Sequence, residues 1–224
     1  MRIDTQVNLL QANQDCAAEN RVFFQEKGIF AVNMIASPGA GKTALIESIL
    51  GLEGCAEEIA VIEGDLATAK DAERIRSSGA QVVQINTDGG CHLDAKMIQR
   101  VLPAFDLTKV KFLLIENVGN LVCPSAFDLG EDLRMIVLSV TEGADKPSKY
   151  PTTFCKADAV IFNKMDLLPY VDFDLSLAQK DILHLAPQCQ FFQTIARLGH
   201  DKGMQEIYAY LCAQRNRKMA YGNR

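Results

Sequence analysis

Residues 30–43, FAVNMIASPGAGKT, decide the fold of this 224-residue chain. Phe30–Ala36 is a mostly apolar run that predicts a buried strand. It leads directly into the glycine-containing turn SPGAGKT, and the ALIESIL that follows has the pattern of a helix. A strand, a glycine loop and a helix in this order form a phosphate-binding loop, or P-loop. The sequence therefore predicts a nucleotide-binding α/β protein.

The residue types in this loop each suit phosphate binding. Gly39 and Gly41 let the backbone wrap closely around a phosphate and point its N–H groups inward. Lys42 starts the helix and can reach the β- and γ-phosphates, while the Thr43 hydroxyl can coordinate Mg²⁺. Ala36 stands where the common pattern has its first Gly, so that position must adopt a backbone conformation open to an L-residue. The expected nucleotide contacts here are Gly39, Ala40, Gly41, Lys42, Thr43 and Ala44.

The rest of the chain alternates strand-like and helix-like segments. Further strands are predicted over 58–63, 80–85, 111–115, 134–140, 157–162 and 190–193, and helices over 42–50, 67–77, 95–102, 175–185 and 204–218. The alternation predicts βαβ units, with a mostly parallel sheet covered by helices on both faces. Residues 5–26 predict an amphipathic helix packed on the sheet, with Val7, Leu10, Cys16 and Ala17 on its apolar side. We expect a single P-loop domain over 1–224 that includes this N-terminal helix (1–28).

Asn163-Lys164-Met165-Asp166 follows the strand predicted at 157–162 and matches the NKxD motif of GTPases. The Asp166 carboxylate can accept hydrogen bonds from N1–H and the 2-amino group of guanine. Adenine offers neither donor there, so ATP would leave a desolvated carboxylate unpaired. The stem of Lys164 can cover the base, and Asn163 can tie this loop to the P-loop. The motif therefore predicts GTP and GDP as ligands.

Two acidic residues end predicted strand segments where the γ-phosphate and Mg²⁺ should lie. We expect Asp65, in IAVIEGD, to bind Mg²⁺ directly or through water, together with Thr43. Glu116, in KFLLIE, is a second ligand or orients a Mg²⁺-bound or attacking water. Gly119 allows the backbone to change conformation when the γ-phosphate binds or is lost. Lys42, Asp65 and Glu116 are thus the candidate catalytic residues, and slow hydrolysis is expected because no water-positioning Gln is evident.

Cys91, His92 and Cys123 form a candidate soft-metal site. Thiolate and imidazole ligands suit Ni²⁺ or Zn²⁺ rather than Mg²⁺. Spacing alone leaves open that these cysteines are ordinary core residues. Cys123, however, lies seven residues after Glu116, at most ~25 Å of extended chain, so movement of 117–122 must pull on a metal ligand. With three donors per chain, a closed site needs a second chain, a water or another residue.

Composition excludes several other classes of protein. Lys plus Arg number 23 and Asp plus Glu 28, a net charge of −5 that disfavours binding to nucleic acid or anionic membranes. No apolar run approaches the ~20 residues of a membrane helix, and the first residues lack the apolar stretch of a secretory signal. Seven scattered cysteines then suggest free thiols in a reducing cytoplasm.

The ordered motifs GAGKT, EGD, GGCHLDA, IENVGNLVCP, SVTEG, DKP and NKMD closely resemble those of the HypB family, the hydrogenase nickel-incorporation GTPases. The resemblance covers nearly the whole chain, including NQDCAAENR in the N-terminal helix. It implies a nucleotide-dependent homodimer with Cys91, His92 and Cys123 binding nickel or zinc at its interface. It also implies work with a HypA-type nickel chaperone and the [NiFe]-hydrogenase large-subunit precursor. Residues 194–199, TIARLG, depart from the family's usual Ser-Ala pair, although Ala196 is still expected to contact guanine through its backbone.

The sequence thus favours a GTP-hydrolysing metallochaperone in which GTP-dependent dimerisation is coupled to the metal site. Two alternatives remain. A P-loop phosphotransferase would use ATP, against which NKMD argues. A nucleotide-gated GTPase regulator with structural cysteines would be indifferent to metal.

Overall fold

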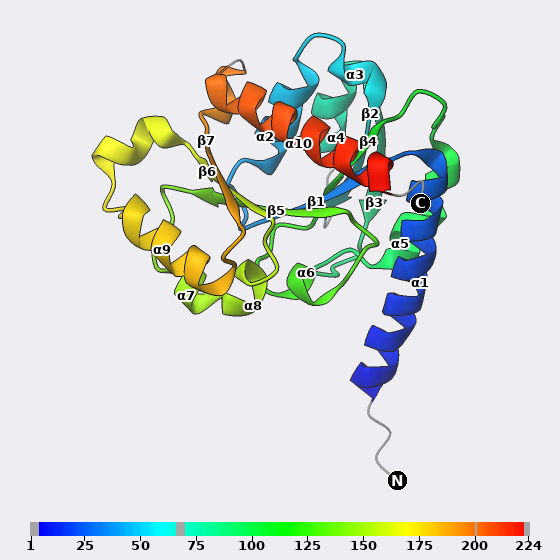
Figure 1. Cartoon of the computed structure of the whole chain (residues 1–224), viewed down its shortest axis with the longest axis horizontal. Helices are drawn as coiled ribbons and strands as arrows, with labels where there is room; N and C mark the ends of the chain where they lie inside the picture. Colours follow the sequence, from blue (N-terminus) through cyan, green and yellow to red (C-terminus); the bar gives the residue numbers. More distant parts are fainter. Residues whose placement is uncertain (1–4, 66–69, 200, 222–224) are drawn as a thin grey trace.

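The computed structural model describes residues 5–65, 70–199 and 201–221, and its centre is a seven-stranded parallel sheet (Figure 1). The spatial order is β3-β2-β4-β1-β5-β6-β7. The strands are β1 (Phe30–Ala36), β2 (Ile59–Asp65), β3 (Gln81–Asn86), β4 (Phe112–Glu116), β5 (Leu133–Ser139), β6 (Ala159–Asn163) and β7 (Gln190–Gln193). Each strand end lies within two residues of its expected position. The predicted α/β sheet is therefore confirmed.

Helices cover both faces of this sheet, as predicted (Figure 1). One face carries α2 (Lys42–Leu50), α3 (Cys55–Glu58), α4 (Lys70–Arg76) and α10 (Lys202–Tyr221). The other carries α1 (Thr5–Lys27), α5 (Ala95–Val101), α6 (Cys123–Ala126), α7 (Lys146–Lys149), α8 (Pro151–Phe154) and α9 (Leu175–Leu185). Three 3₁₀ turns, η1 (Leu102–Ala104), η2 (Met165–Tyr170) and η3 (Ala196–Leu198), lie in the connections. Of the helix predicted over 67–77, residues 67–69 lie outside the described residues.

Strand β1 shows why the sheet is buried on both faces. Val32 and Met34 join the apolar cluster beneath α2 and α10, whereas Ala31 and Ile35 join clusters on the opposite face. Because successive side chains of a strand point to opposite faces, both sets must be apolar. This explains the continuous apolar run in the sequence.

Helix α1 differs from its expected amphipathic pattern. Its buried stripe consists of Asn13, Ala17, Asn20 and Phe24. Leu10, expected on the apolar side, is 38% exposed, and that expectation is wrong. Cys16 is half-buried, and the side chain of Val7 lies outside the described residues. The physical reason is that two asparagine amides hydrogen-bond to backbone in positions where apolar contacts were expected. The first turns of α1 extend beyond the rest of the molecule (Figure 1).

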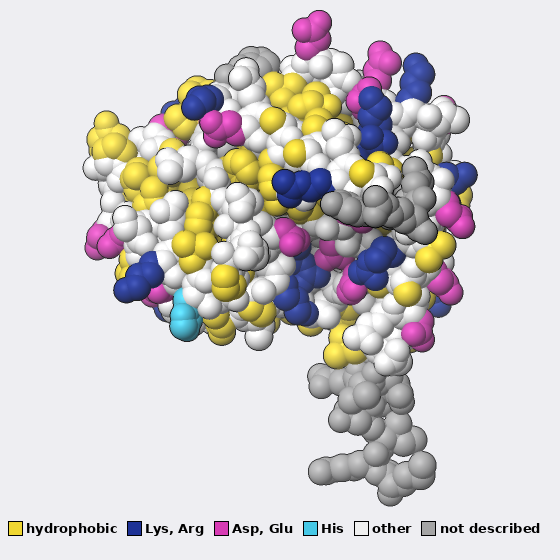
Figure 2. Space-filling view, in the orientation of Figure 1, with side chains coloured by type: hydrophobic (Ala, Val, Ile, Leu, Met, Phe, Trp, Pro, Cys, Tyr) yellow, Lys and Arg dark blue, Asp and Glu magenta, His cyan; other side chains and the backbone are white. Residues whose placement is uncertain are grey.

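The surface agrees with the weak net charge of the chain. On the face drawn in Figure 2, basic and acidic side chains are interspersed. Among the described helices, none combines the length and apolar character needed to cross a bilayer.

Candidate functional site

The P-loop connects β1 to α2 at the carboxyl edge of the sheet. Gly39 and Gly41 both have positive φ, +75° and +102°. A Cβ at Gly41 would lie 2.3 Å from Asn163 Nδ2, so this position requires glycine for space as well as for conformation. Ala36 is the last residue of β1, is fully buried and has no positive φ. The alanine is therefore accommodated as an ordinary strand residue.

Glu116 ends β4, next to β1, and meets the start of α2. Thr43 Oγ1 donates to Glu116 Oε1 at 2.8 Å, and both residues are buried, as is Lys42. Asp65 ends β2, and its side chain lies outside the described residues. A hydroxyl and a carboxylate side by side at a P-loop form the hard oxygen donor set that suits Mg²⁺.

Glu63 was missed by the sequence analysis. It is only 3% exposed and aligns with Glu116 in the pairing of β2 with β4. Two buried carboxylates thus occupy matching positions of adjacent strands. The signal in the sequence was a carboxylate within an otherwise apolar strand, IAVIE, because buried acids are rare unless they are partnered.

The segment after β6 is tied to the P-loop. Asn163 Nδ2 donates to Ala40 O at 2.8 Å, and Asn163 Oδ1 accepts from Ala196 N at 3.1 Å. Lys164 has a left-handed backbone (φ +62°), and its Nζ donates to Gly39 O at 2.8 Å. The structure therefore brings together the predicted phosphate-binding, base-reading and 194–199 segments.

Asp166 has two carboxylate oxygens with different surroundings. Oδ2 accepts a hydrogen bond from Arg197 Nη2 at 2.6 Å. Oδ1 is buried and has no hydrogen-bond partner among the described residues. A buried, unpartnered acceptor is costly, so this oxygen is suited to a donor supplied by a ligand.

The three soft-metal candidates lie close together on two loops. Cys91 Sγ is 3.6 Å from His92 Nδ1, and the Cys91 side chain also interacts with that of Cys123, the first residue of α6. The interaction with Cys123 and partial burial raise the pKa of Cys91. Burial lowers the pKa of His92, whose ring stacks on Phe127 with centroids 3.8 Å apart. The imidazole is therefore neutral at neutral pH and able to donate a lone pair.

The described part of one chain does not complete this site. Among the described residues, no three His, Cys, Asp or Glu side chains are arranged to hold a metal ion. All seven cysteines are free thiols, of which Cys55 and Cys189 are buried. Cys91 and Cys123, by contrast, are partly exposed, and this favours a ligand role over a core role.

Asn117 connects the phosphate side to the thiol side. It directly follows Glu116, and its Oδ1 accepts from Leu93 N at 3.1 Å, two residues from Cys91. Its Nδ2 donates to Asn33 Oδ1 at 3.2 Å within β1. A Cβ at Gly119 would lie 3.3 Å from Pro38 Cα, so the same segment also lies against the P-loop.

Helix α1 holds the two thiol-bearing loops from outside. Asn13 accepts from Ala95 N at 2.9 Å and donates to Asp128 O at 2.8 Å. Asn20 Nδ2 donates to Ala95 O at 2.8 Å and to Leu129 O at 3.0 Å. One helix face is therefore bonded both to the segment after His92 and to the segment after Cys123.

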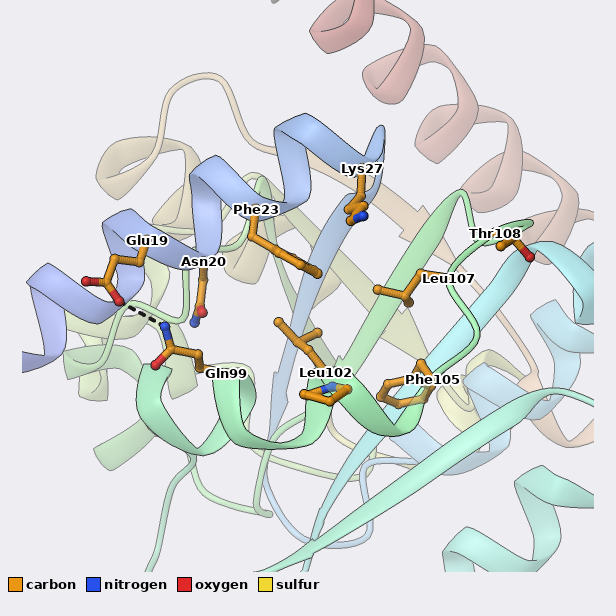
Figure 3. Close-up of a pocket in the computed structure, with 10 residues that line it drawn as sticks. Glu19, Asn20, Phe23, Lys27, Gln99, Leu102, Phe105, Leu107 and Thr108 are labelled. Carbon is orange, nitrogen blue, oxygen red and sulfur yellow. Dashed lines mark hydrogen bonds between the residues drawn. The ribbon is translucent and has the colours of Figure 1, made fainter.

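A cavity of about 470 Å³ lies between α1 and the α5–η1 segment (Figure 3). Its walls include Phe23, Leu102 and Phe105, and Glu19 bonds to Gln99 across one end at 2.9 Å. None of the lining residues belongs to the predicted nucleotide or metal sites. This cavity therefore belongs to the α1–α5 packing seam and is separate from the P-loop.

Lys146 is a further residue near the P-loop. Its Nζ donates to Ser37 Oγ at 3.3 Å and pairs with Glu142 at 3.1 Å. In the sequence, this TEG–DKP region marks only the family resemblance, because nothing in its local pattern points to the P-loop.

Comparison with known proteins agrees with this geometry. The profile of the CobW/HypB/UreG nucleotide-binding domain matches residues 31–193. The hydrogenase maturation factor HypB of Rhizobium leguminosarum bv. viciae is 47% identical over 209 residues, 93% of this chain and 69% of that protein. HypB of Escherichia coli K12 is 42% identical, covering 95% of this chain and 73% of that protein.

Solved structures show the same fold. The crystal structure of HypB from Helicobacter pylori in complex with nickel superposes with a TM-score of 0.87 at 36% identity, covering 93% of this chain and 97% of that one. HypB from Archaeoglobus fulgidus gives a TM-score of 0.83 at 37% identity, covering 92% and 99%. The chain therefore belongs to the HypB family of hydrogenase maturation factors, within the CobW/HypB/UreG nucleotide-binding class.

Proposed function

We propose that this chain binds nickel as cargo and couples its binding and release to GTP hydrolysis during [NiFe]-hydrogenase maturation. Membership of the HypB family makes it a GTPase of the CobW/HypB/UreG class. The observation that carries the coupling is the bond from Asn117, next to Glu116, to the backbone beside Cys91 and His92. A nucleotide-sensing segment and a metal-binding loop thus share one polar contact.

In the nucleotide half, the backbone of residues 39–44 and Lys42 hold the phosphates, while Asp166 reads guanine. Asn163 and Ala196 position the base-reading loop, and their mutual hydrogen bond supports this role. Lys164, bonded to Gly39 O, lies where its stem can cover the base.

Thr43, Asp65 and Glu116 are the proposed Mg²⁺ ligands. The donor set observed at Thr43 and Glu116 fits this ion. Bound Mg²⁺ supplies neutralisation of the charge on the β- and γ-phosphates. Glu116 can also orient the attacking water, because its carboxylate reaches the position where α2 begins.

In the metal half, Cys91, His92 and Cys123 supply three soft donors per chain. Because the described residues of one chain form no closed site, we place the metal, nickel or zinc, at the interface of a homodimer drawn together by GTP. A relative from Helicobacter pylori has been crystallised with nickel, which supports this assignment.

The cellular setting follows from the family. The proposed partners are a HypA-type nickel chaperone and the [NiFe]-hydrogenase large-subunit precursor, with no role for nucleic acid or a membrane. A reducing cytoplasm, where thiols remain available, suits the site. We treat 1–224 as one working domain, including the N-terminal helix.

Equilibrium dialysis with Ni²⁺ and Zn²⁺, with and without a non-hydrolysable GTP analogue, tests the proposal. We expect bound metal to depend on the nucleotide, and a C91A/C123A double variant to lose it. A C55A/C189A variant is the matched control, because those thiols are buried elsewhere. Unchanged stoichiometry in C91A/C123A would instead support a GTPase regulator with structural cysteines.

A further inference from the structure

The carboxylate that reads guanine is already engaged within the chain. Asp166 Oδ2 accepts from Arg197 Nη2 at 2.6 Å, while the buried Oδ1 has no partner among the described residues. Guanine presents two donors to such a carboxylate, N1–H and the 2-amino group. Arg197 therefore occupies one of the two carboxylate oxygens that the base needs as acceptors.

The guanidinium of Arg197 can dissociate from Asp166. Its side chain is 70% exposed, compared with 20% for Asp166. Its backbone, however, is fixed, because the preceding Ala196 N donates to Asn163 Oδ1 at 3.1 Å and Gly199 (φ +75°) ends the η3 turn. The fixed backbone keeps the Arg197 side chain near Asp166, while its exposure to solvent allows the guanidinium to dissociate.

We propose that Arg197 sets the affinity for guanine nucleotides by competing with the base for Asp166. The proposal rests on Asp166 being the base reader. Guanine binds the fraction of molecules in which Arg197 has released Oδ2, so the apparent affinity falls by that fraction. Exposed ion pairs of this kind contribute about 0.2–1 kcal/mol, which corresponds to a reduction of about two- to sixfold.

Titration of the full-length chain with GDP and with inorganic tripolyphosphate tests this directly. R197A should bind GDP about two- to sixfold more tightly, by removing the competitor. Its affinity for tripolyphosphate should be unchanged, because that ligand has no base. R74A is the matched control, since Arg74 pairs with Glu47 at the same 2.6 Å, away from Asp166.

Salt provides a second readout that a purely structural role would not give. Screening weakens the exposed Arg197–Asp166 pair. The ratio of the GDP dissociation constants of wild type and R197A should therefore approach one as salt rises. The common effect of salt on phosphate binding cancels in this ratio.

Three results would overturn the proposal: weaker GDP binding by R197A, unchanged GDP binding, or an equal gain for tripolyphosphate. A D166N variant separates its failure from that of the proposed function. If D166N loses GDP affinity while R197A does nothing, only the competitor role is wrong. If D166N also binds GDP normally, the base-reading assignment fails too. If both assignments hold, R197A should add no gain in the D166N background.

Discussion

Two regions of this molecule are built in different ways. We call them the nucleotide corner, which comprises the P-loop with Glu116 and residues 163–166, and the thiol corner, which comprises Cys91, His92 and Cys123. The first is held by contacts among its own parts, with Asn163, Lys164 and Thr43 bonding across β1, β4 and β6. The second has its donors on two loops that are held from outside by α1. The contrast suggests that one chain can bind nucleotide unaided, whereas metal binding depends on elements beyond the ligands themselves.

The largest effect is expected at Asp166, the proposed guanine-binding residue of the nucleotide corner. D166N should lower GDP affinity by about 100-fold, because the carboxylate's charged hydrogen bonds are each worth about 1.5–3 kcal/mol. Isothermal titration with GDP measures this loss. The control is a D172N variant, because Asp172 is exposed. Nickel binding in the absence of nucleotide should not change. A parallel loss of metal would show that the two corners are not built independently.

The thiol corner should respond to pH where the nucleotide corner does not. The raised pKa of Cys91 keeps its thiol protonated, so metal must displace that proton. Nickel affinity should rise about tenfold per pH unit for each proton released, up to the pKa of the thiol. His92 adds no such dependence near neutrality, because its pKa is lowered and the ring is already neutral. Metal titrations from pH 6 to about 8 test the sign, and a flat profile would contradict thiol ligation.

Asn117 tests the connection between the corners. N117A removes the hydrogen bonds to Leu93 N and Asn33 Oδ1. We expect the effect of nucleotide on nickel affinity to shrink several-fold, since coupling energies of 1–3 kcal/mol are typical. A thermal melt must accompany the measurement, because a buried polar contact is lost. Full coupling in a folded N117A protein would exclude this residue as the link.

The smallest expected effect is at the α1 support. N20A should lower the free energy of unfolding by about 1–2 kcal/mol and weaken nickel binding a few-fold. Asn20 donates to Ala95 O and Leu129 O, so its loss loosens both thiol loops. GDP affinity should be unaltered. Q14A, which removes an amide at an exposed position on the same helix, is the control, and equal behaviour of the two variants would argue against the support role.

The features that could be predicted from sequence are those encoded over short distances. The strand Phe30–Ala36, the P-loop and NKMD are local patterns, and β1 and α2 have the expected bounds. The role of Asn20 could not be predicted, because its partners lie 75 and 109 residues away. A polar residue on a buried helix stripe looks like a surface residue until its backbone partners are known.

The same limit applies to the candidate site. Cys91, His92 and Cys123 were predicted individually, but their separation was not, since it depends on Asn117 and α1. Arg197 and Glu63 were missed because their importance lies in what stands opposite them, Asp166 and Glu116. The sequence pattern predicts which residues carry the chemistry, and tertiary contacts determine how those residues are arranged.

Reciprocal titration tests whether the nickel and nucleotide sites are coupled. Nickel affinity is measured with GDP and with a non-hydrolysable GTP analogue, and the affinity for each nucleotide is measured with and without nickel. We expect nickel and nucleotide to change each other's affinity by the same factor, because binding linkage is reciprocal. Identical nickel affinities in the two nucleotide states, with cysteine ligation intact, would contradict this coupling.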